Sequence, residues 1–293
     1  MGYQFGHPET VPVGTGGTGE HFSGKRCFIT GASSGIGYGL AERLLQRGAA
    51  EVWICSRNEG RIREAAEKLE QAYGRVHWRA IDVCDEEKIG EFMDEMASSG
   101  PVDYVFANAG VSTARSFHKT TREQFDRILE PNLYGVFYTD QAALKVMLKQ
   151  GYGHILNVSS MEGYFANGYH SAYIASKFAV YGLTESLRYE YADRNILFST
   201  ICPGPVISNI WGRDAKGDVH HEVQAPPGAL TELQAADEIL AGIEEGRNII
   251  IVTDTARTSW QKLHEAPESA DRFAARYTQA NRDVALYIEA TEK

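Results

Sequence analysis

The sequence predicts an α/β fold in three layers, doubly wound around a mostly parallel sheet of seven strands. Two observations predict this fold. From residue 26 to residue 253, short apolar runs alternate with longer stretches of helical periodicity. The first apolar run leads directly into a glycine-rich turn, after which a helix begins. Such alternation produces a parallel sheet that helices cover on both faces, with ligands at the carboxyl ends of the strands.

The apolar runs are interpreted as strands because they are short and separated by helical stretches. They span residues 26–30, 51–56, 76–81, 102–107, 154–159, 196–202 and 248–253. The intervening stretches are amphipathic. In residues 61–71, for example, Ile62, Ala65, Ala66 and Leu69 fall on one stripe of a helix. Right-handed crossovers then make the fold doubly wound.

Composition narrows the class of protein. The chain has 293 residues, 43% of them hydrophobic, and a formal charge of −10. This acidity argues against nucleic acid or an anionic membrane as a partner, since both attract clustered Lys and Arg. The four cysteines form no C-x-x-C pair and are interpreted as buried free thiols. With no apolar run of membrane-spanning length and no signal-peptide pattern, the sequence predicts a soluble, cytoplasmic protein.

Three segments are predicted along the chain. Residues 1–24 are rich in glycine, lack apolar periodicity, and are interpreted as a flexible arm. Residues 25–253 form the dinucleotide-binding and catalytic domain. Residues 254–293 form a helical extension, in which apolar residues recur as an interrupted stripe.

The glycine-rich turn is predicted to hold a pyrophosphate. It consists of Thr30, Gly31, Ala32, Ser33, Ser34, Gly35, Ile36 and Gly37, between a strand and a helix. Glycine allows backbone N–H groups to approach phosphate oxygens, and the helix N-terminus adds partial positive charge. The alternative is a turn that only packs helix on strand. The candidate cofactor contacts here are Gly31, Ser33, Ser34, Gly35, Ile36 and Gly37.

Arg57 indicates which dinucleotide is bound. An acidic residue at the end of the second strand binds a ribose 2′-hydroxyl, whereas an arginine accommodates a 2′-phosphate. Here the strand ends in Ser56 and Arg57, with Glu59 already inside the next helix. NADP(H) is therefore preferred, with NAD(H) as the alternative. Arg57 as an ordinary exposed residue at a helix start is the competing interpretation.

Tyr173 and Lys177 are the candidate catalytic pair. At positions i and i+4 of a helix, a phenol and an ammonium share one face, and the cation is expected to lower the pKa of the phenol. Ser160 follows the fifth predicted strand. Each residue alone has an ordinary interpretation: a packing tyrosine, a solvated lysine and a strand-end cap. Their joint spacing favours chemistry at a carbonyl.

Together these motifs resemble those of the short-chain dehydrogenase/reductase family, in its single-domain branch with a Rossmann-like fold. The resemblance covers about residues 24–253. Besides the glycine turn and the catalytic residues, it rests on motifs after three strands and within one helix: Asp82 and Val83, then Asn108, Ala109 and Gly110, then Asn132, then Pro203 and Gly204. Val206 and Ser208 stand where the family places a valine and a threonine near the nicotinamide.

The resemblance implies a role for each residue. Tyr173 would be the general acid, Ser160 would stabilise charge on the carbonyl oxygen, and Lys177 would hold the ribose. Asn132 would hold a water that links Lys177 to solvent. The implied cofactor contacts are Ser56, Arg57, Asp82, Val83, Asn108, Ala109, Gly110, Tyr173, Lys177, Pro203, Gly204, Val206 and Ser208. Asp82 as a helix cap and Asn108 as a support of the sheet remain alternatives.

The substrate pocket is predicted from the segment between Ser160 and Tyr173. Its three aromatic residues and one methionine indicate a bulky, apolar substrate. The candidate pocket residues are Met161, Phe165, His170 and Trp211, although packing is an equal interpretation for Trp211 and the better one for His170. Residues 207–230 are predicted to form a loop over the substrate. The pair His220–His221 lacks ligand partners, so no metal is expected.

The sequence therefore predicts an NADPH-dependent carbonyl reductase that acts on a small-molecule ketone or aldehyde and that can run in reverse as an alcohol dehydrogenase. An NAD-dependent secondary-alcohol dehydrogenase is the nearest alternative, and a dinucleotide sensor without turnover is another. Relatives usually end in a glycine-rich strand that builds a tetramer, which the helical extension replaces here. A homodimer or homotetramer is expected, and the extension is predicted to clasp a partner subunit, cover a sheet edge or wall the pocket.

Overall fold

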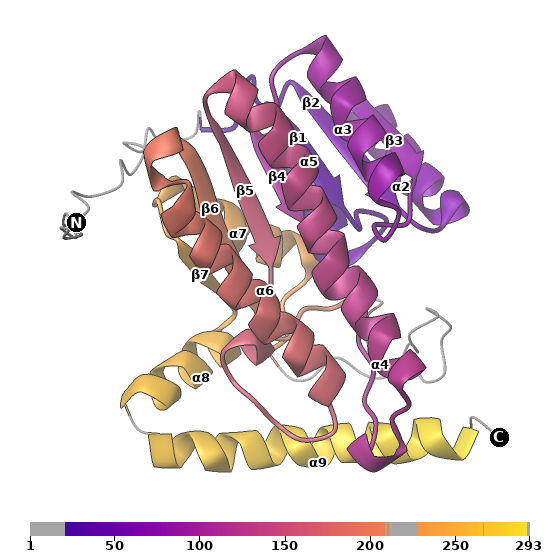
Figure 1. Ribbon diagram of the computed structural model, residues 1–293, viewed down its shortest axis with the longest axis vertical. Coiled ribbons are helices and arrows are strands. Elements are labelled where there is room, and N and C mark those ends of the chain that lie inside the picture. Colours follow the sequence, from indigo (N-terminus) through magenta and orange to yellow (C-terminus); the bar gives the residue numbers. More distant parts are fainter. Residues whose placement is uncertain (1–20, 209, 211–227, 266, 292–293) are drawn as a thin grey trace, which may run out of the picture.

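One sheet of seven strands organises the protein (Figure 1). The computed structural model describes residues 21–208, 210, 228–265 and 267–291. The strand order is β3-β2-β1-β4-β5-β6-β7, and every neighbouring pair is parallel. The strands are β1 (Arg26–Thr30), β2 (Glu51–Ser56), β3 (Val76–Ala80), β4 (Tyr104–Ala107), β5 (Gly153–Val158), β6 (Ile196–Pro203) and β7 (Ile249–Val252). The predicted doubly wound α/β fold is confirmed.

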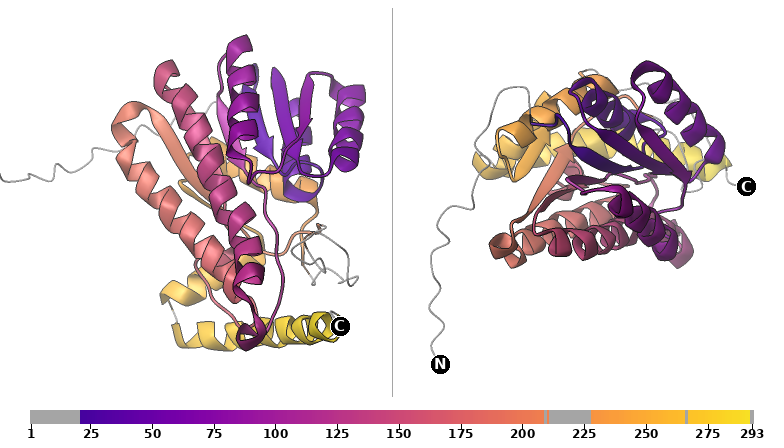
Figure 2. Two further views of the ribbon diagram at one scale, coloured as in Figure 1. Left: turned by 45° about the vertical axis from the view of Figure 1, so that its right-hand side comes forward. Right: turned by 90° about the horizontal axis from the view of Figure 1, so that it is seen from above.

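Helices connect the strands and cover both faces of the sheet. They are α1 (Gly35–Gln46), α2 (Glu59–Tyr73), α3 (Glu86–Ser99), α4 (Arg122–Leu129), α5 (Gly135–Gln150), α6 (Ser171–Glu190), α7 (Glu232–Glu244), α8 (Asp254–Glu265) and α9 (Pro267–Thr291). Shorter helical turns are η1 (Phe117–Lys119), η2 (Glu130–Tyr134), η3 (Met161–Gly163) and η4 (Ala192–Arg194). Helices α1, α2 and α7 lie on one face, and α3, α5 and α6 on the other (Figure 2).

Each face of the sheet has its own apolar core. Leu44, Ile54 and Ile239 represent the core under α1, α2 and α7. Phe28 and Met147 belong to the core under α3 and α5. Because both faces are buried, the central strands are mainly apolar, and all five residues of β1 are buried, including Arg26 and Thr30 at its ends. This double burial explains why the strands were recognisable as continuous apolar runs.

Local capping fixes where the helices begin. Asn58 accepts a hydrogen bond from the backbone N–H of Arg61 and so caps α2. Asp85 accepts one from the N–H of Lys88 and caps α3. The alternative interpretation of Asp82 as this cap is therefore wrong. The Asp82 carboxylate instead accepts a hydrogen bond from the N–H of Cys84, at 3.1 Å, which shapes the turn after β3.

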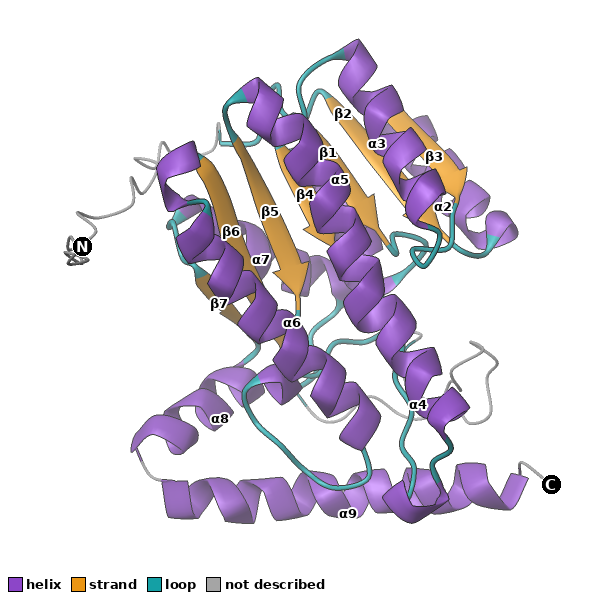
Figure 3. Ribbon diagram, viewed as in Figure 1, coloured by secondary structure: helices purple, strands orange, loops and turns teal. Residues whose placement is uncertain are grey.

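The two ends of the described chain both pack on the domain. Phe22, within the segment that the sequence assigns to the arm, is fully buried, so residues 21–24 belong with the core. The predicted helical extension is confirmed as α8 and α9. Figure 3 shows α9 crossing below the carboxyl ends of the strands. Of the three roles predicted for the extension, this position fits a wall of the pocket, while clasping a partner stays a prediction.

Candidate active site

A cavity of about 320 Å³ lies at the carboxyl ends of the strands. The residues that the sequence predicts for the site and that line this cavity are Gly31, Ser33, Ser34, Gly35, Ile36, Ser56, Arg57, Asp82, Val83, Asn108, Ala109, Gly110, Ser160, Met161, His170, Tyr173, Lys177, Pro203, Gly204, Val206 and Ser208. Four predicted residues are not among them: Gly37, Asn132 and Phe165 lie behind the lining, and Trp211 is outside the described residues. Most of the predicted loop over the substrate is also outside them.

The glycine turn is shaped as a cradle. Gly31 has a φ of +71°, and a Cβ there would lie 2.7 Å from the Cα of Ala109. A Cβ on Gly37 would lie 2.6 Å from Nδ2 of Asn108. Neither position has room for a side chain, because the chain after β4 packs closely against the turn, and the backbone of Gly31 lines the cavity. A pyrophosphate fits this bare backbone at the start of α1.

Asn108 ties the glycine turn to the neighbouring strand. Its Nδ2 donates to the carbonyl oxygen of Thr30 at 2.9 Å. The hydroxyl of Thr30 in turn accepts from the N–H groups of Asn108 and Ala109, each at 3.0 Å. These bonds join the ends of β1 and β4 across the sheet. The supporting role that was the alternative for Asn108 is therefore present, and a contact with the cofactor stays a prediction.

Arg57 lies at the far end of the cavity, after β2. Beside it, the hydroxyls of Ser33 and Ser56 are 2.9 Å apart, which joins the glycine turn to the end of β2. Glu59 pairs with Arg63 at 3.7 Å on the exposed side of α2. After Ser56, the cavity is lined by Arg57, Asn58 and Arg61, and Asp82 lines it after the neighbouring strand β3.

Tyr173 and Lys177 project from the first two turns of α6. Both are buried, and Nζ of Lys177 lies 5.6 Å from the centre of the Tyr173 ring. Burial lowers the pKa of Lys177 to about 8. Burial, followed by the charge of Glu162, raises the pKa of Tyr173 above its ordinary value, against a hydrogen bond from Ser160. The lowered phenol pKa expected from Lys177 is therefore not found in the protein alone.

Ser160 stands at the end of β5, facing Tyr173. Its hydroxyl accepts a hydrogen bond from the N–H of Glu162 at 3.1 Å, and donates a long one to the carbonyl of Pro203 at 3.5 Å. Lys177 donates from Nζ to the carbonyl of Val158 at 2.9 Å. These contacts hold both side chains at the same edge of the sheet, where the cavity opens.

Asn132 lies within η2, a single wide turn between α4 and α5. The side chain is fully buried. Its Oδ1 accepts from the N–H of Val111 at 2.7 Å, and its Nδ2 donates to the carbonyl of Val111 at 2.9 Å and to Ser176 at 3.0 Å. Asn132 thus fixes the chain after β4 and contacts the second turn of α6, between Tyr173 and Lys177. The water that it is expected to hold stays a prediction.

The residues that line the substrate end of the cavity differ from the predicted set: one predicted residue is absent from the lining, and several others are present. Phe165 does not line it but packs edge-on against Phe273 of α9, with ring centres 5.3 Å apart. Sequence reasoning missed Ser112, Glu162, Tyr277 and Asn281, all of which line the cavity. Glu162 lay in the predicted pocket segment without a pattern that marked it. A pocket wall was one of three roles predicted for the extension, but no pattern in its sequence singled out Tyr277 and Asn281.

Among the described residues, no group of three or more His, Cys, Asp or Glu side chains gathers in a way that would hold a metal ion. Within the same part of the chain, every helix is too short or too polar to cross a membrane.

Comparisons with known proteins show which family the chain resembles. The family model described as short chain dehydrogenase matches residues 25–218. A 3-oxoacyl-[acyl-carrier-protein] reductase of Rickettsia prowazekii is 32% identical over 188 residues, which cover 64% of this chain and 75% of the relative. A D-beta-hydroxybutyrate dehydrogenase of Rhizobium meliloti is 30% identical over 234 residues, which cover 79% of this chain and 88% of the relative.

A solved structure shares the fold. It is a short chain dehydrogenase of Burkholderia cenocepacia in complex with NADP, with a TM-score of 0.73, 24% identity, and coverage of 86% of this chain and 98% of its own. The bare glycine cradle supports a nicotinamide dinucleotide as the cofactor. The chain belongs to the short-chain dehydrogenase/reductase family and is an oxidoreductase that acts on CH–OH or C=O groups.

Proposed function

We propose that the protein is an NADPH-dependent carbonyl reductase, with Tyr173 as the general acid. The observation that carries the proposal is the arrangement of the cavity. Tyr173, Ser160 and Lys177 line one end, and Arg57 lines the other, beyond the glycine cradle. An arginine in that position favours a ribose that carries a 2′-phosphate. NADPH serves cells mainly as a reductant, so reduction is the proposed direction.

Side chains of the protein would donate the proton to the carbonyl oxygen and stabilise the negative charge that develops there. A nicotinamide dinucleotide supplies hydride when it is bound. The raised pKa of Tyr173 keeps the phenol protonated at neutral pH, which suits a proton donor to the carbonyl oxygen. The hydroxyl of Ser160 would donate a hydrogen bond to the same oxygen and stabilise the charge that develops on it. Lys177, in its charged form, would stabilise the phenolate that remains.

The general acid is tested by replacing Tyr173 with Phe. We expect kcat for ketone reduction to fall by about 10²- to 10⁴-fold, the usual contribution of general acid catalysis. NADPH binding, measured by fluorescence titration, should persist. Tyr189 is a matched control because it lies on the same helix and is 66% exposed; Tyr189→Phe should keep wild-type activity. Full activity in Tyr173→Phe would show that another group donates the proton.

The cofactor preference is tested by replacing Arg57 with Ala. Loss of a charge-assisted contact to the 2′-phosphate should weaken NADPH binding by about ten-fold or more and leave NADH binding nearly unchanged. Arg63→Ala is the control because Arg63 pairs with Glu59 on the exposed side of α2. If the wild type bound NADH as tightly as NADPH or more tightly, NAD would be the preferred cofactor. Arg57 would then not be the residue that binds a 2′-phosphate.

A further inference from the structure

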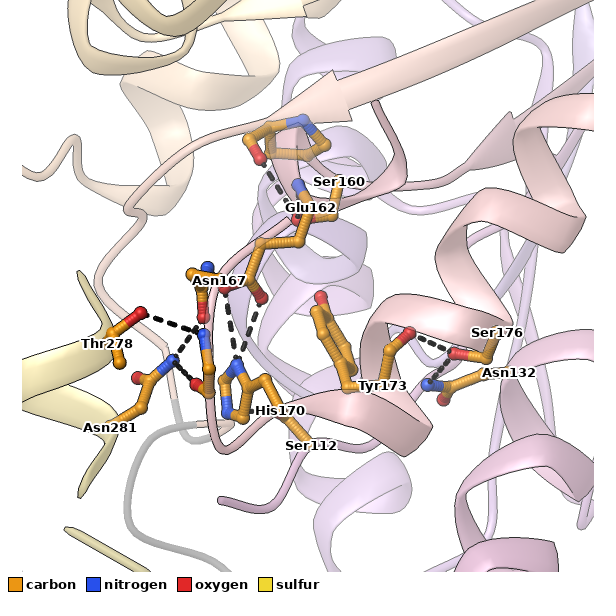
Figure 4. A network of polar contacts seen from close by, with 12 residues as sticks. Ser112, Asn132, Ser160, Glu162, Asn167, His170, Tyr173, Ser176, Thr278 and Asn281 are labelled. Atoms are coloured by element: carbon orange, nitrogen blue, oxygen red, sulfur yellow. Dashed lines mark hydrogen bonds and ion pairs between the residues drawn. The ribbon is translucent and has the colours of Figure 1, made fainter. Parts of the chain in front are cut away.

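The cavity contains a buried histidine–carboxylate pair that the proposed proton transfer does not use. Nδ1 of His170 lies 3.0 Å from Oε2 of Glu162, and both residues line the cavity. Glu162 is 8% exposed and His170 is 7% exposed. Burying such a pair costs desolvation free energy, so its presence in the substrate wall calls for a function. Figure 4 shows the pair beside Tyr173.

The carboxylate of Glu162 decides how the imidazole of His170 is used. A carboxylate bound at Nδ1 keeps a proton on that nitrogen and leaves Nε2 for a second partner. In this structure Nε2 lies 3.4 Å from the hydroxyl of Ser112, a long contact, and both groups line the cavity. Nε2 is therefore oriented toward the place where substrate binds.

Helix α9 holds this pair in place through a chain of hydrogen bonds. Nδ2 of Asn281 donates to Oδ1 of Asn167 at 2.7 Å, and Nδ2 of Asn167 donates to Oε1 of Glu162. The backbone N–H of Gly168 donates to the hydroxyl of Thr278 at 2.8 Å. The carboxylate that orients His170 is thus itself positioned from the C-terminal extension (Figure 4).

The backbone next to His170 is held in a conformation that few residues adopt. Tyr169 has a φ of +64° although it is not glycine. Its carbonyl accepts a hydrogen bond from the N–H of Arg115 at 2.7 Å. Strained backbone of this kind persists where the surroundings fix it, and it concentrates at binding sites. The position of His170 is therefore imposed by the fold and is not a consequence of loose packing.

The charge of Glu162 limits which substrates fit. Burial raises the pKa of Glu162, but the charge of His170 and hydrogen bonds from His170 and Asn167 together bring it below its ordinary value. The carboxylate is therefore ionised, and its field reaches Tyr173. When His170 is neutral, this negative charge would repel a substrate carboxylate beside the reacting carbonyl. A hydroxyl suits Nε2 in either protonation state of His170, because a hydroxyl both donates and accepts hydrogen bonds.

Resting on the proposed carbonyl reduction, we propose that His170, oriented by Glu162, binds an uncharged hydroxyl group that the substrate carries close to its carbonyl. The rings of His170 and Tyr173 have their centres 5.4 Å apart, so a short carbon skeleton spans their polar ends. The substrate class is then a hydroxy ketone, with the hydroxyl on the first or second carbon from the carbonyl. Asn281 is a positioning residue that acts through Asn167 and Glu162.

The test compares three aryl ketones with the full chain and NADPH: 2-hydroxyacetophenone, acetophenone and the anion benzoylformate. We expect kcat/KM for the hydroxy ketone to exceed that for acetophenone by about ten-fold, the effect of one hydrogen bond to a buried partner. Benzoylformate should be the poorest of the three. Equal use of the first two ketones by the wild type, or preference for benzoylformate, would overturn the inference.

Variants then locate the preference. His170→Phe should bring the ratio between hydroxy ketone and acetophenone close to one, whereas His170→Gln, which keeps a hydrogen-bonding group, should retain part of it. Asn281→Leu should lower the ratio in the wild type but not further in His170→Phe, because it acts through His170. Gln279→Leu is the control, since Gln279 is exposed on α9 and pairs with Asp283. Additive effects of the two substitutions would contradict the positioning role.

Failure of the inference is distinguishable from failure of the proposed function. If the wild type reduces none of the three ketones and none of a wider panel, the carbonyl reductase proposal fails. If it reduces acetophenone and its hydroxy derivative alike, only the role of His170 fails. NADPH binding and the melting temperature report whether each variant folds. Should His170→Phe not fold, the wild-type preference and Asn281→Leu decide the question.

Discussion

The two walls of the cavity are built in different ways. The cofactor wall consists of backbone at strand ends and of the glycine turn, tied within the sheet by Thr30 and Asn108. The substrate wall consists of side chains on residues 161–170, held by α9 from 114 positions away in the chain, between Asn167 and Asn281. The first wall follows from local sequence, and the second from long-range packing. Substitutions in the substrate wall can therefore change substrate specificity without disturbing the glycine cradle that binds the cofactor.

The largest effect is expected at the substrate wall. Phe165 is 3% exposed and packs on Phe273 and Tyr277. Phe165→Ala should lower the free energy of unfolding by about 3–5 kcal/mol, through lost burial and the cavity left behind. Urea unfolding measures this change. The KM for a bulky ketone should rise, while the Kd for NADPH should stay the same.

Phe117→Ala provides the matched control, because Phe117 is 69% exposed and its loss should change stability by no more than about 0.5 kcal/mol. If Phe165→Ala weakened NADPH binding as much as it raised the KM for ketone, the cofactor wall and the substrate wall would not be independent of each other.

A smaller effect on stability, confined to the cofactor wall, is expected from Gly37→Ala. The new Cβ would approach Nδ2 of Asn108 to 2.6 Å and the carbonyl oxygen of Gly31 to 2.7 Å. Overpacking of this kind costs about 1–3 kcal/mol, and the displaced cradle should bind NADPH poorly. Isothermal titration calorimetry measures the Kd.

Gly90 offers the control for that substitution. A Cβ on Gly90, within α3, meets nothing within 4 Å, so Gly90→Ala should bind NADPH normally and stabilise the helix by about 0.5–1 kcal/mol. Unchanged NADPH affinity in Gly37→Ala would mean that the cradle has more room than its geometry indicates.

The smallest effect is expected from a buried carboxyl that belongs to neither wall. Burial raises the pKa of Asp140, on α5, from 3.8 to about 8. Between these values the folded protein retains a proton that the unfolded chain releases, so the free energy of unfolding falls as pH rises. The expected decrease is about 1 kcal/mol between about pH 6 and about pH 7.

Asp140→Asn should remove this slope, as thermal unfolding at several pH values would reveal, and should leave the affinities for NADPH and ketone unchanged. A slope that survived the substitution would have to come from another group. A change in either affinity would show that the two walls communicate through the helices behind the sheet.

The sequence predicted the fold and the cofactor wall well for a physical reason. Strands buried on both faces are continuous apolar runs, and parallel strands bring their carboxyl ends to one edge. Residues placed just after a strand, such as Arg57, Asn108 and Ser160, were thereby assigned to the site without knowledge of side-chain packing. The spacing of Tyr173 and Lys177 on one helix is equally local.

The substrate wall could not be predicted in the same way. An apolar stripe on the tail fits any apolar surface, so a pocket wall was only one of three predicted roles, and the stripe did not single out Tyr277 and Asn281. Phe165 was assigned to the pocket because it is aromatic, whereas it faces α9. Packing was the better interpretation of a lone histidine, because the Glu162 partner of His170 is recognisable only in three dimensions. The raised pKa of Tyr173 has the same origin, since it depends on burial and on Glu162.

The wide turn η2 constrains the number of residues between α4 and α5. A π-type turn contains one more residue than an α-helical turn, and each residue of a helix rotates the next by about 100°. Deleting a single residue from Glu130–Tyr134 would restore a regular helix and swing Asn132 away from Val111 and Ser176. The faces of α4 and α5 would also lose their relative phase. The number of residues in this segment is therefore fixed by the rotation that it imposes between α4 and α5. In a loop, by contrast, the number of residues is fixed mainly by the distance to be spanned.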